Sequence, residues 1–266
     1  MIRVSVIIPS YCPGAYLWEC LDSMDRQSFP KSGFEVILVL NGCKEPYYSQ
    51  IQDYLYAHPE FPCRLLQTDR AGVSNARNMG LDASRGEYVS FIDDDDYVSS
   101  SYLEELFSKA DRETISLCRP VAFLDGDNDE LPDYRISKEY TKFREKGKQP
   151  FSHPKKFFSG PCMKLIHKDI IGDRRFDIRF KNGEDSLFMF LLSDRMKWCD
   201  FSSPEAVYFR RFRNGSAAMS RRGIMENAAN SFRLILEYTK LYLKGFPHYS
   251  FSFYGTRILG SLRSIF

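Results

Sequence analysis

The chain has 266 residues, of which 43% are hydrophobic, and this is enough to form the core of one large domain. Its net charge of +2 carries no overall signature of nucleic-acid binding, so we expect no nucleic-acid partner. Seven cysteines without a CxxC pair, no apolar run of membrane-spanning length and no signal-peptide pattern together predict a cytoplasmic protein without disulfides or structural zinc.

The first 110 residues alternate between two hydrophobic patterns. Continuous apolar, β-branched runs predict strands at residues 4–8, 34–40, 63–67 and 87–92. Apolar residues at helical spacing predict helices near residues 17–24, 51–58, 73–81 and 103–110. Strands that alternate with helices indicate βαβ units, and therefore an α/β fold with a Rossmann-like, mostly parallel central sheet flanked by helices.

The pattern is weaker after residue 112. Residues 125–133 form an acidic, turn-rich stretch, and residues 138–148 are either a mobile segment or a helix. Further strands are predicted at 162–167 and 206–210, and further helices at 184–194 and 223–243.

Polar residues follow each of the four N-terminal strands. They are Ser10-Tyr11, Asn41-Gly42, Asp69-Arg70 and the run Asp93–Asp96. Ligands of open parallel sheets bind beyond the carboxyl ends of the strands, so these residues predict one site at that edge.

The run Asp93–Asp96 is the strongest chemical signal. Four adjacent carboxylates repel one another unless a positive group neutralises them, and a hard divalent cation such as Mg²⁺ or Mn²⁺ prefers such oxygen ligands. The cation can also stabilise negative charge on a leaving phosphate. The alternative is an acidic N-terminus of the helix that follows, near residues 99–109.

Two further stretches suggest phosphate-binding and base functions. Gly72 permits close backbone approach just before a helix, and Arg77 on that helix can offer a planar guanidinium to a phosphate or pair with neighbouring carboxylates. Glu184 and Asp185 open a later helix. A carboxylate there can act as a general base, or it can simply favour the helix N-terminus.

Several stretches fit motifs that occur together in one enzyme family. Residues 4–11 and 39–43 fit its first two strand ends, residues 72–80 match GxSxARNxG, and residues 86–96 match GEYIxFLDxDD. Later matches are Lys164-Leu165, Phe176, Gly183-Glu184-Asp185, Tyr208, Arg210 and Ser216. In this order and spacing the chain resembles family 2 glycosyltransferases, well over residues 2–110 and moderately over 160–220.

The resemblance implies a GT-A fold with a catalytic domain over residues 1–220. Its nucleotide-sugar half would be 1–110 and its acceptor half 111–220, followed by a helical, aromatic extension over 221–266. It also implies an inverting transfer from a nucleotide-sugar, with UDP the expected nucleotide. The acceptor would be a hydroxyl of a saccharide or of a lipid-linked molecule in cell-surface glycan synthesis.

Carried over position by position, the resemblance gives each candidate residue a role. The residues that would bind the donor are Pro9, Tyr11, Asn41, Asp69, Arg77, Asp93, Asp94 and Arg210. A divalent cation, Mn²⁺ or Mg²⁺, would be held by Asp95 and Asp93, with Asp96 in support. Asp185 would be the general base, with Glu184 beside it. Leu40-Asn41 departs from the acidic pair frequent in the family, which leaves a different nucleotide preference open.

Other functions stay open from the sequence. A non-catalytic, nucleotide-sugar-binding member of the fold is one, although both acidic motifs are intact. A nucleotidyltransferase usually has a basic, glycine-rich loop after its first strand, but residues 10–14 contain no Lys or Arg. A glycosidase could use paired carboxylates and would need no nucleotide.

The C-terminal part has a composition of its own. Residues 205–266 contain 10 Lys and Arg but 3 acidic residues, and residues 246–266 are rich in aromatics. This suits peripheral contact with an anionic surface, here the inner face of the cytoplasmic membrane. It equally suits a tail that packs on the domain or forms a homodimer contact.

Overall fold

The computed structural model describes residues 1–126, 129–131, 133–213 and 223–265. Ser216 and three residues of the acidic stretch, 127, 128 and 132, therefore lie outside the described residues. Within the described part, no helix combines the length and the apolar character needed to cross a membrane.

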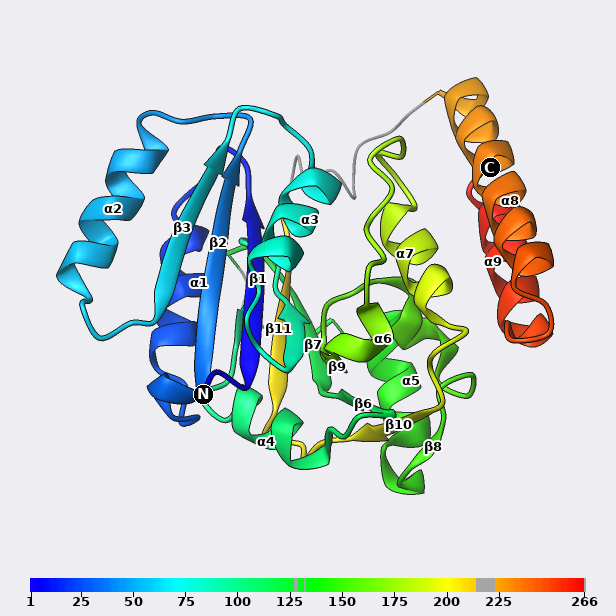
Figure 1. The fold of residues 1–266 in the computed structure, drawn as a ribbon, viewed down its shortest axis with the longest axis horizontal. Helices are drawn as coiled ribbons and strands as arrows, with labels where there is room; N and C mark the ends of the chain where they lie inside the picture. The colour runs from blue at the N-terminus through cyan, green and yellow to red at the C-terminus, as the bar shows by residue number, and fades with distance from the viewer. Residues whose placement is uncertain (127–128, 132, 214–222, 266) are drawn as a thin grey trace.

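An eight-stranded sheet forms the centre of the molecule (Figure 1). Its strands, in spatial order, are β3 (Cys63–Thr68), β2 (Phe34–Asn41), β1 (Val4–Ser10), β4 (Tyr88–Phe91), β9 (Lys164–His167), β6 (Thr114–Leu117), β10 (Trp198–Phe201) and β8 (Gln149–Pro150). The strands β3, β2, β1 and β4 run parallel, whereas β9 is antiparallel to both of its neighbours. The predicted α/β fold with a mostly parallel sheet is confirmed.

The strand order changes direction at β1. The chain moves outward from β1 to β2 and β3, and then returns to place β4 on the other side of β1. The carboxyl ends of β1 and β4 therefore lie side by side at the point where the strand order reverses, which is the usual place for a ligand in such a sheet.

Helices cover the sheet and extend the molecule. They are α1 (Tyr16–Asp25), α2 (Tyr47–Ala57), α3 (Val73–Ala83), α4 (Tyr102–Lys109), α5 (Arg135–Phe143), α6 (Lys168–Ile171), α7 (Glu184–Leu192), α8 (Ile224–Lys244) and α9 (Phe251–Arg263), with short 3₁₀ turns η1 (Lys31–Gly33), η2 (Arg144–Lys146) and η3 (Lys155–Ser159). In Figure 1, α3 lies in front of the sheet and α1 behind it. The segment predicted as either mobile or helical, 138–148, is thus largely helical.

Both faces of β2 are buried, which explains its continuous apolar sequence. Ile37 and Val39 pack with Ala76 of α3, whereas Val36 and Leu38 belong to the larger core cluster on the other side. A strand that is covered on both faces has no polar face to alternate with.

A second, three-stranded sheet follows the acidic run. It consists of β5 (Tyr97–Val98), β11 (Val207–Phe212) and β7 (Arg119–Leu124), with β11 in the middle. Because β11 pairs with β5, residues about 110 positions later in the chain return to the acidic run.

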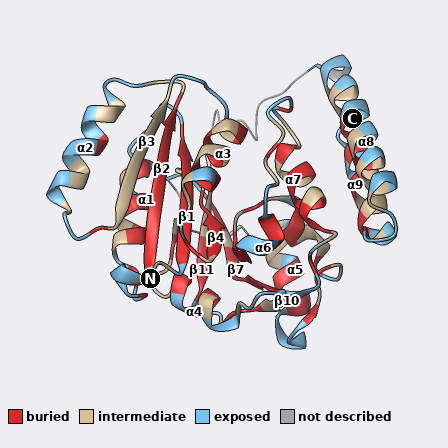
Figure 2. Ribbon diagram, in the orientation of Figure 1, coloured by how far each residue is buried: buried red, intermediate tan, exposed pale blue. Residues whose placement is uncertain are grey.

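The helices α8 and α9 pack together at one end of the molecule (Figure 1). The two C-terminal helices contain both buried and exposed residues (Figure 2), and the aromatic ones are divided between core and surface. Tyr249 and Phe253 are buried, and their rings lie 4.9 and 6.0 Å from that of Phe190 on α7. Phe246 and Phe251 are exposed. The predicted helical, aromatic extension is confirmed, and part of it belongs to the core.

Candidate active site

A cleft of about 930 Å³ opens beyond the carboxyl ends of β1 and β4. Most residues predicted for the site line it: Pro9, Tyr11, Asn41, Arg77, Asp93, Asp94, Asp95, Asp96, Glu184, Asp185 and Arg210. Asp69 is the exception among them, because it is exposed outside this lining and accepts a hydrogen bond from Gln67 at 2.7 Å.

Arg77 joins the two acidic motifs. Its side chain is only 3% exposed, and it donates to Asp93 Oδ1 at 2.8 Å and to Asp185 Oδ1 at 2.6 Å. Its guanidinium also lies over the ring of Phe176, 5.4 Å from the centroid. Burial opposes the charge of Arg77, but the carboxylates of Asp185 and Asp93 outweigh it and raise the pKa of Arg77. Arg77 thus pairs with the neighbouring carboxylates, which was one of its two expected roles, and it also lines the cleft.

Asp94 and Asp95 lie in different surroundings. Asp94 Oδ2 accepts a hydrogen bond from the Ser10 hydroxyl at 2.6 Å, yet burial raises the pKa of Asp94 to about 7. Asp95 Oδ2 accepts from Nε of Arg213 at 2.7 Å. Burial and the nearby Asp93 charge raise the pKa of Asp95, while Arg213 opposes that shift.

Asp96 is the least exposed aspartate of the run, although it still contributes to the cleft lining. Its Oδ2 accepts from the Tyr208 hydroxyl at 2.6 Å and its Oδ1 from the Arg211 backbone N–H at 2.8 Å. Both donors are on β11, so Asp96 fastens the second sheet to the acidic run. This geometry fits a supporting role for Asp96 better than direct contact with a ligand.

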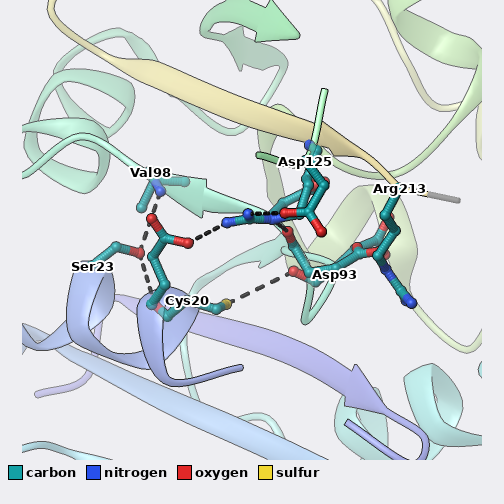
Figure 3. Close-up of polar contacts among 10 residues, drawn as sticks. Cys20, Ser23, Asp93, Val98, Asp125 and Arg213 are labelled. Carbon is teal, nitrogen blue, oxygen red and sulfur yellow. Dashed lines mark hydrogen bonds and ion pairs between the residues drawn. The ribbon is translucent and has the colours of Figure 1, made fainter. Parts of the chain in front are cut away.

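Side chains from α1 hold the acidic run from the opposite side (Figure 3). The Cys20 thiol lies 3.7 Å from the backbone carbonyl of Asp93, and the Ser23 hydroxyl accepts from the Val98 N–H at 3.3 Å. Arg211 adds ion pairs to Asp125, at 2.7 Å, and to Glu19 of α1. The backbone of the run is therefore fixed between α1 and β11.

Glu184 and Asp185 begin α7 on the other wall of the cleft. Glu184 is buried, and this burial together with Asp185 raises the pKa of Glu184 to about 7. Asp185 is 33% exposed; its burial raises its pKa, and Arg77 works against that shift. Both carboxylates line the cleft, but Asp185 is the more exposed of the two and the one that forms an ion pair with Arg77, which favours its ionised form.

The remaining predicted residues lie at the β1 and β2 ends. Tyr11 is 58% exposed and presents its ring to the cleft. Asn41 is buried, and its amide group donates to the Ser10 carbonyl at 2.7 Å and accepts from the Gly72 N–H at 2.9 Å. Asn41 therefore fastens the loop before α3 to β1, a supporting contact that the sequence did not predict.

Sequence reasoning missed two arginines of the cleft, Arg211 and Arg213. The available signal was the basic run Arg210-Arg211-Phe212-Arg213, which begins at the last residue of the predicted strand 206–210. The strand alternation alone does not show that β11 lies next to the acidic run. Among the residues that the structure describes, no group of three or more His, Cys, Asp or Glu side chains is arranged to hold a metal ion.

Comparison with known proteins gives this site a family. A model of glycosyl transferase family 2 matches residues 5–175. The chain belongs to glycosyl transferase family 2. The uncharacterized glycosyltransferase EpsJ of Bacillus subtilis is 36% identical over 114 residues, which are 43% of this chain and 32% of EpsJ. The chain thus spans about a third of the length of that relative.

Solved structures show the same fold. Staphylococcus aureus TarS 1–349 in complex with UDP-GlcNAc has a TM-score of 0.75 at 19% identity, over 99% of this chain and 72% of that chain. The mannosyltransferase PcManGT from Pyrobaculum calidifontis, in complex with GDP-Man and Mn²⁺, has a TM-score of 0.65 at 18% identity, over 99% and 69% of the two chains. The GT-A fold implied by the sequence motifs is confirmed.

Proposed function

We propose that this chain is an inverting glycosyltransferase that moves a sugar from a nucleotide-sugar to an acceptor hydroxyl in cell-surface glycan synthesis. The observation that carries the proposal is the bridge made by Arg77. It holds Asp93, at the end of β4, and Asp185, 92 residues later in the chain, on one guanidinium inside one cleft. The family supports this activity, and relatives of this fold bind UDP-GlcNAc and GDP-Man.

In this proposal the acidic run and its neighbours bind the donor. Tyr11 offers its exposed ring to the nucleoside base, and Arg210 approaches the diphosphate. Asp93 and Asp95 offer carboxylate oxygens to the cleft, and these are ligands that Mn²⁺ and Mg²⁺ accept. A cation held there would neutralise charge on the diphosphate.

Asp185 is the general base of this proposal. It accepts the proton of the acceptor hydroxyl while that oxygen bonds to the anomeric carbon. The bond between this carbon and the phosphate oxygen breaks, and the nucleoside diphosphate leaves from the opposite face of the sugar, which inverts the configuration. Arg77 opposes the rise that burial causes in the pKa of Asp185 and fixes the direction of its carboxylate, so Arg77 is a positioning residue.

Calorimetric titration with UDP, GDP, dTDP and CDP, each with and without Mn²⁺, tests the donor half. We expect Mn²⁺-dependent binding of one nucleotide, with UDP expected, and its loss in Asp95→Ala. Asp185→Asn is the matched control, because it should bind the nucleotide and lose transfer of the sugar. Absence of nucleotide binding in the folded protein would refute the proposal. Near-normal transfer by Asp185→Asn would refute the base assignment, and binding without any turnover in wild type would favour a non-catalytic member.

The surface of α8 is the place where we propose contact with an anionic membrane. Met225, Phe232, Leu236 and Leu243 are 88, 62, 52 and 69% exposed, and their spacing of seven, four and seven residues places them on one helix face. We call these four residues the α8 stripe.

Cations flank the α8 stripe. Arg233, Lys240 and Lys244 are exposed and share the spacing of seven and four residues, so they form a parallel row beside it. An apolar stripe with cations along one edge is complementary to the interface of an anionic bilayer. This moves the proposed contact from residues 246–266 to α8, because Tyr249 and Phe253 are part of the core.

Sedimentation with vesicles of phosphatidylglycerol and of phosphatidylcholine tests this contact. We expect binding to the anionic vesicles that is lost in Phe232→Glu and kept in Tyr56→Glu, which alters a still more exposed aromatic on α2 at the other end of the molecule (Figure 1). Binding that Phe232→Glu leaves intact would refute it. A homodimer that the same substitution dissociates would assign the stripe to a second copy instead.

A further inference from the structure

A second cleft, of about 590 Å³, lies beside the first. It is formed by the start of α5, the turn η3 and the end of β11, and we call it the α5 cleft. Ser159, Arg210 and Phe212 line both clefts, so the two share a wall. A molecule in the α5 cleft can therefore reach the first cleft across these three residues.

The shared wall adjoins the proposed base. A Cβ atom added to Gly160 would lie 3.9 Å from Asp185 Oδ2, so the backbone next to Ser159 passes close to that carboxylate. Lys164 is buried and its ammonium donates to the carbonyls of Gly160 and Cys162 at 2.6 and 2.5 Å, which fixes this loop. An acceptor held in the α5 cleft is thus within reach of the group that would deprotonate it.

The α5 cleft is positively charged. Arg135 is exposed, and neither Arg135 nor Arg210 has a carboxylate partner within 4.0 Å among the described residues. Lys156 adds a third cation, 3.5 Å from Glu139. Asp133 also lines the cleft, but its charge is matched by Lys138 at 2.6 Å.

Aromatic side chains complete the cleft. The Arg210 guanidinium lies 5.4 Å from the ring centroid of Phe212, and it donates to the Tyr134 hydroxyl at 3.3 Å. The flat rings of Tyr134 and Phe212 offer surface to the apolar face of a sugar or polyol, and guanidinium groups offer paired donors to a phosphate.

We propose that the α5 cleft binds the acceptor and that it recognises an acceptor carrying phosphate groups through Arg135 and Lys156, while Arg210 on the shared wall serves the donor diphosphate. This inference rests on the proposed glycosyltransferase function, and it adds the chemical class of the acceptor. The phosphate can belong to a polyol or saccharide phosphate, or to the diphosphate of a lipid-linked acceptor.

Titration of the protein saturated with UDP and Mn²⁺ tests the inference, because UDP then fills the first cleft. The probes are glycerol 3-phosphate, farnesyl diphosphate and the neutral control glycerol. We expect at least one phosphorylated probe to bind and glycerol not to. Arg135→Gln and Lys156→Gln should each weaken that binding about tenfold, the lower end of the range for one lost charge-assisted contact. Lys142→Gln, a change of an exposed lysine on the same helix outside the cleft, should leave it unchanged.

The two phosphorylated probes distinguish the two sources of phosphate. Preference for glycerol 3-phosphate indicates a polyol or saccharide phosphate, and preference for farnesyl diphosphate indicates a lipid-linked acceptor. Normal UDP binding with no binding of either probe, or with equal affinity in all three variants, would overturn the inference and leave the proposed function intact. A folded protein that binds no UDP would overturn both.

Discussion

Replacing Arg77 by lysine tests whether one guanidinium must serve both acidic motifs. Lysine keeps the positive charge, but a single ammonium lacks the planar fork that reaches Asp93 at 2.8 Å and Asp185 at 2.6 Å together. A charge-assisted hydrogen bond contributes about 1.5–3 kcal/mol. Because the two carboxylates are 35 and 33% exposed, solvent screening favours the lower end of that range, about 1.5 kcal/mol.

Loss of one contact of this size corresponds to about a tenfold fall in kcat. The assay is release of UDP from the nucleotide-sugar that the nucleotide titration selects, with water or a saccharide as acceptor. Arg85→Lys is the matched control, because Arg85 pairs with Glu35 at 2.8 Å outside the cleft. We expect Arg85→Lys to change the midpoint of urea unfolding and not kcat. A kcat for Arg77→Lys equal to that of wild type would refute the reasoning.

Three further predictions concern the support of the site, and each is measured by urea unfolding. Burial raises the pKa of Asp94 to about 7 in the folded protein, whereas an aspartate in the unfolded chain titrates near pH 4. The folded state therefore binds more protons between these pH values, so the free energy of unfolding should fall as the pH rises through them. Asp94→Asn should flatten that slope. A steeper slope in the variant would contradict the sign. Tyr208→Phe removes a hydrogen-bond donor from the buried carboxylate of Asp96 and should lower the free energy of unfolding by about 1–3 kcal/mol. An unchanged midpoint would show that this hydrogen bond is dispensable. Gly80→Ala should lower the free energy of unfolding by about 1–3 kcal/mol, because the new methyl group would lie 2.4 Å from Ile7 Cγ2. An unchanged midpoint would show that α3 can shift away from β1 at no cost.

The sequence predicts the N-terminal half well for a physical reason. β1 and β2 are buried on both faces, so their apolar runs are continuous and easily read, and parallel strands require the helices between them. Strands such as β5 and β8 have two residues each and are too short to show a hydrophobic periodicity, which is why the second sheet was not predicted.

The sequence predicted which residues form the candidate site, but it did not predict which of them contact one another. The motifs name Arg77, Asp93 and Asp185, but nothing in the sequence indicates that one guanidinium joins the two carboxylates. Asp69 follows its strand as the other candidates do, yet β3 is farther from the switch point between β1 and β4, and Asp69 lies outside the lining of the cleft. Position at a strand end is therefore informative only together with the place of that strand in the sheet.

The charges of the cleft bear on how a diphosphate can enter it. Its described lining contains six carboxyl groups and five cationic side chains, whose charges nearly balance, so an anionic diphosphate gains little net attraction from the lining alone. Arg213 holds Asp95 Oδ2 at 2.7 Å, and it lies over the ring of Tyr16 at 4.4 Å. A divalent cation that binds Asp95 must therefore compete with Arg213 for this carboxylate.

Arg213→Gln should consequently tighten Mn²⁺ binding to the nucleotide-free protein by about three- to tenfold, the value of one partly screened ion pair. Free Mn²⁺ is measured by electron paramagnetic resonance at pH 8, because loss of Arg213 also removes an interaction that lowers the pKa of Asp95, and protons would compete at lower pH. Asp95→Asn should abolish the gain. Equal Mn²⁺ affinity in wild type and Arg213→Gln would mean that Arg213 and the cation share Asp95, and that the arginine remains in place to meet the diphosphate.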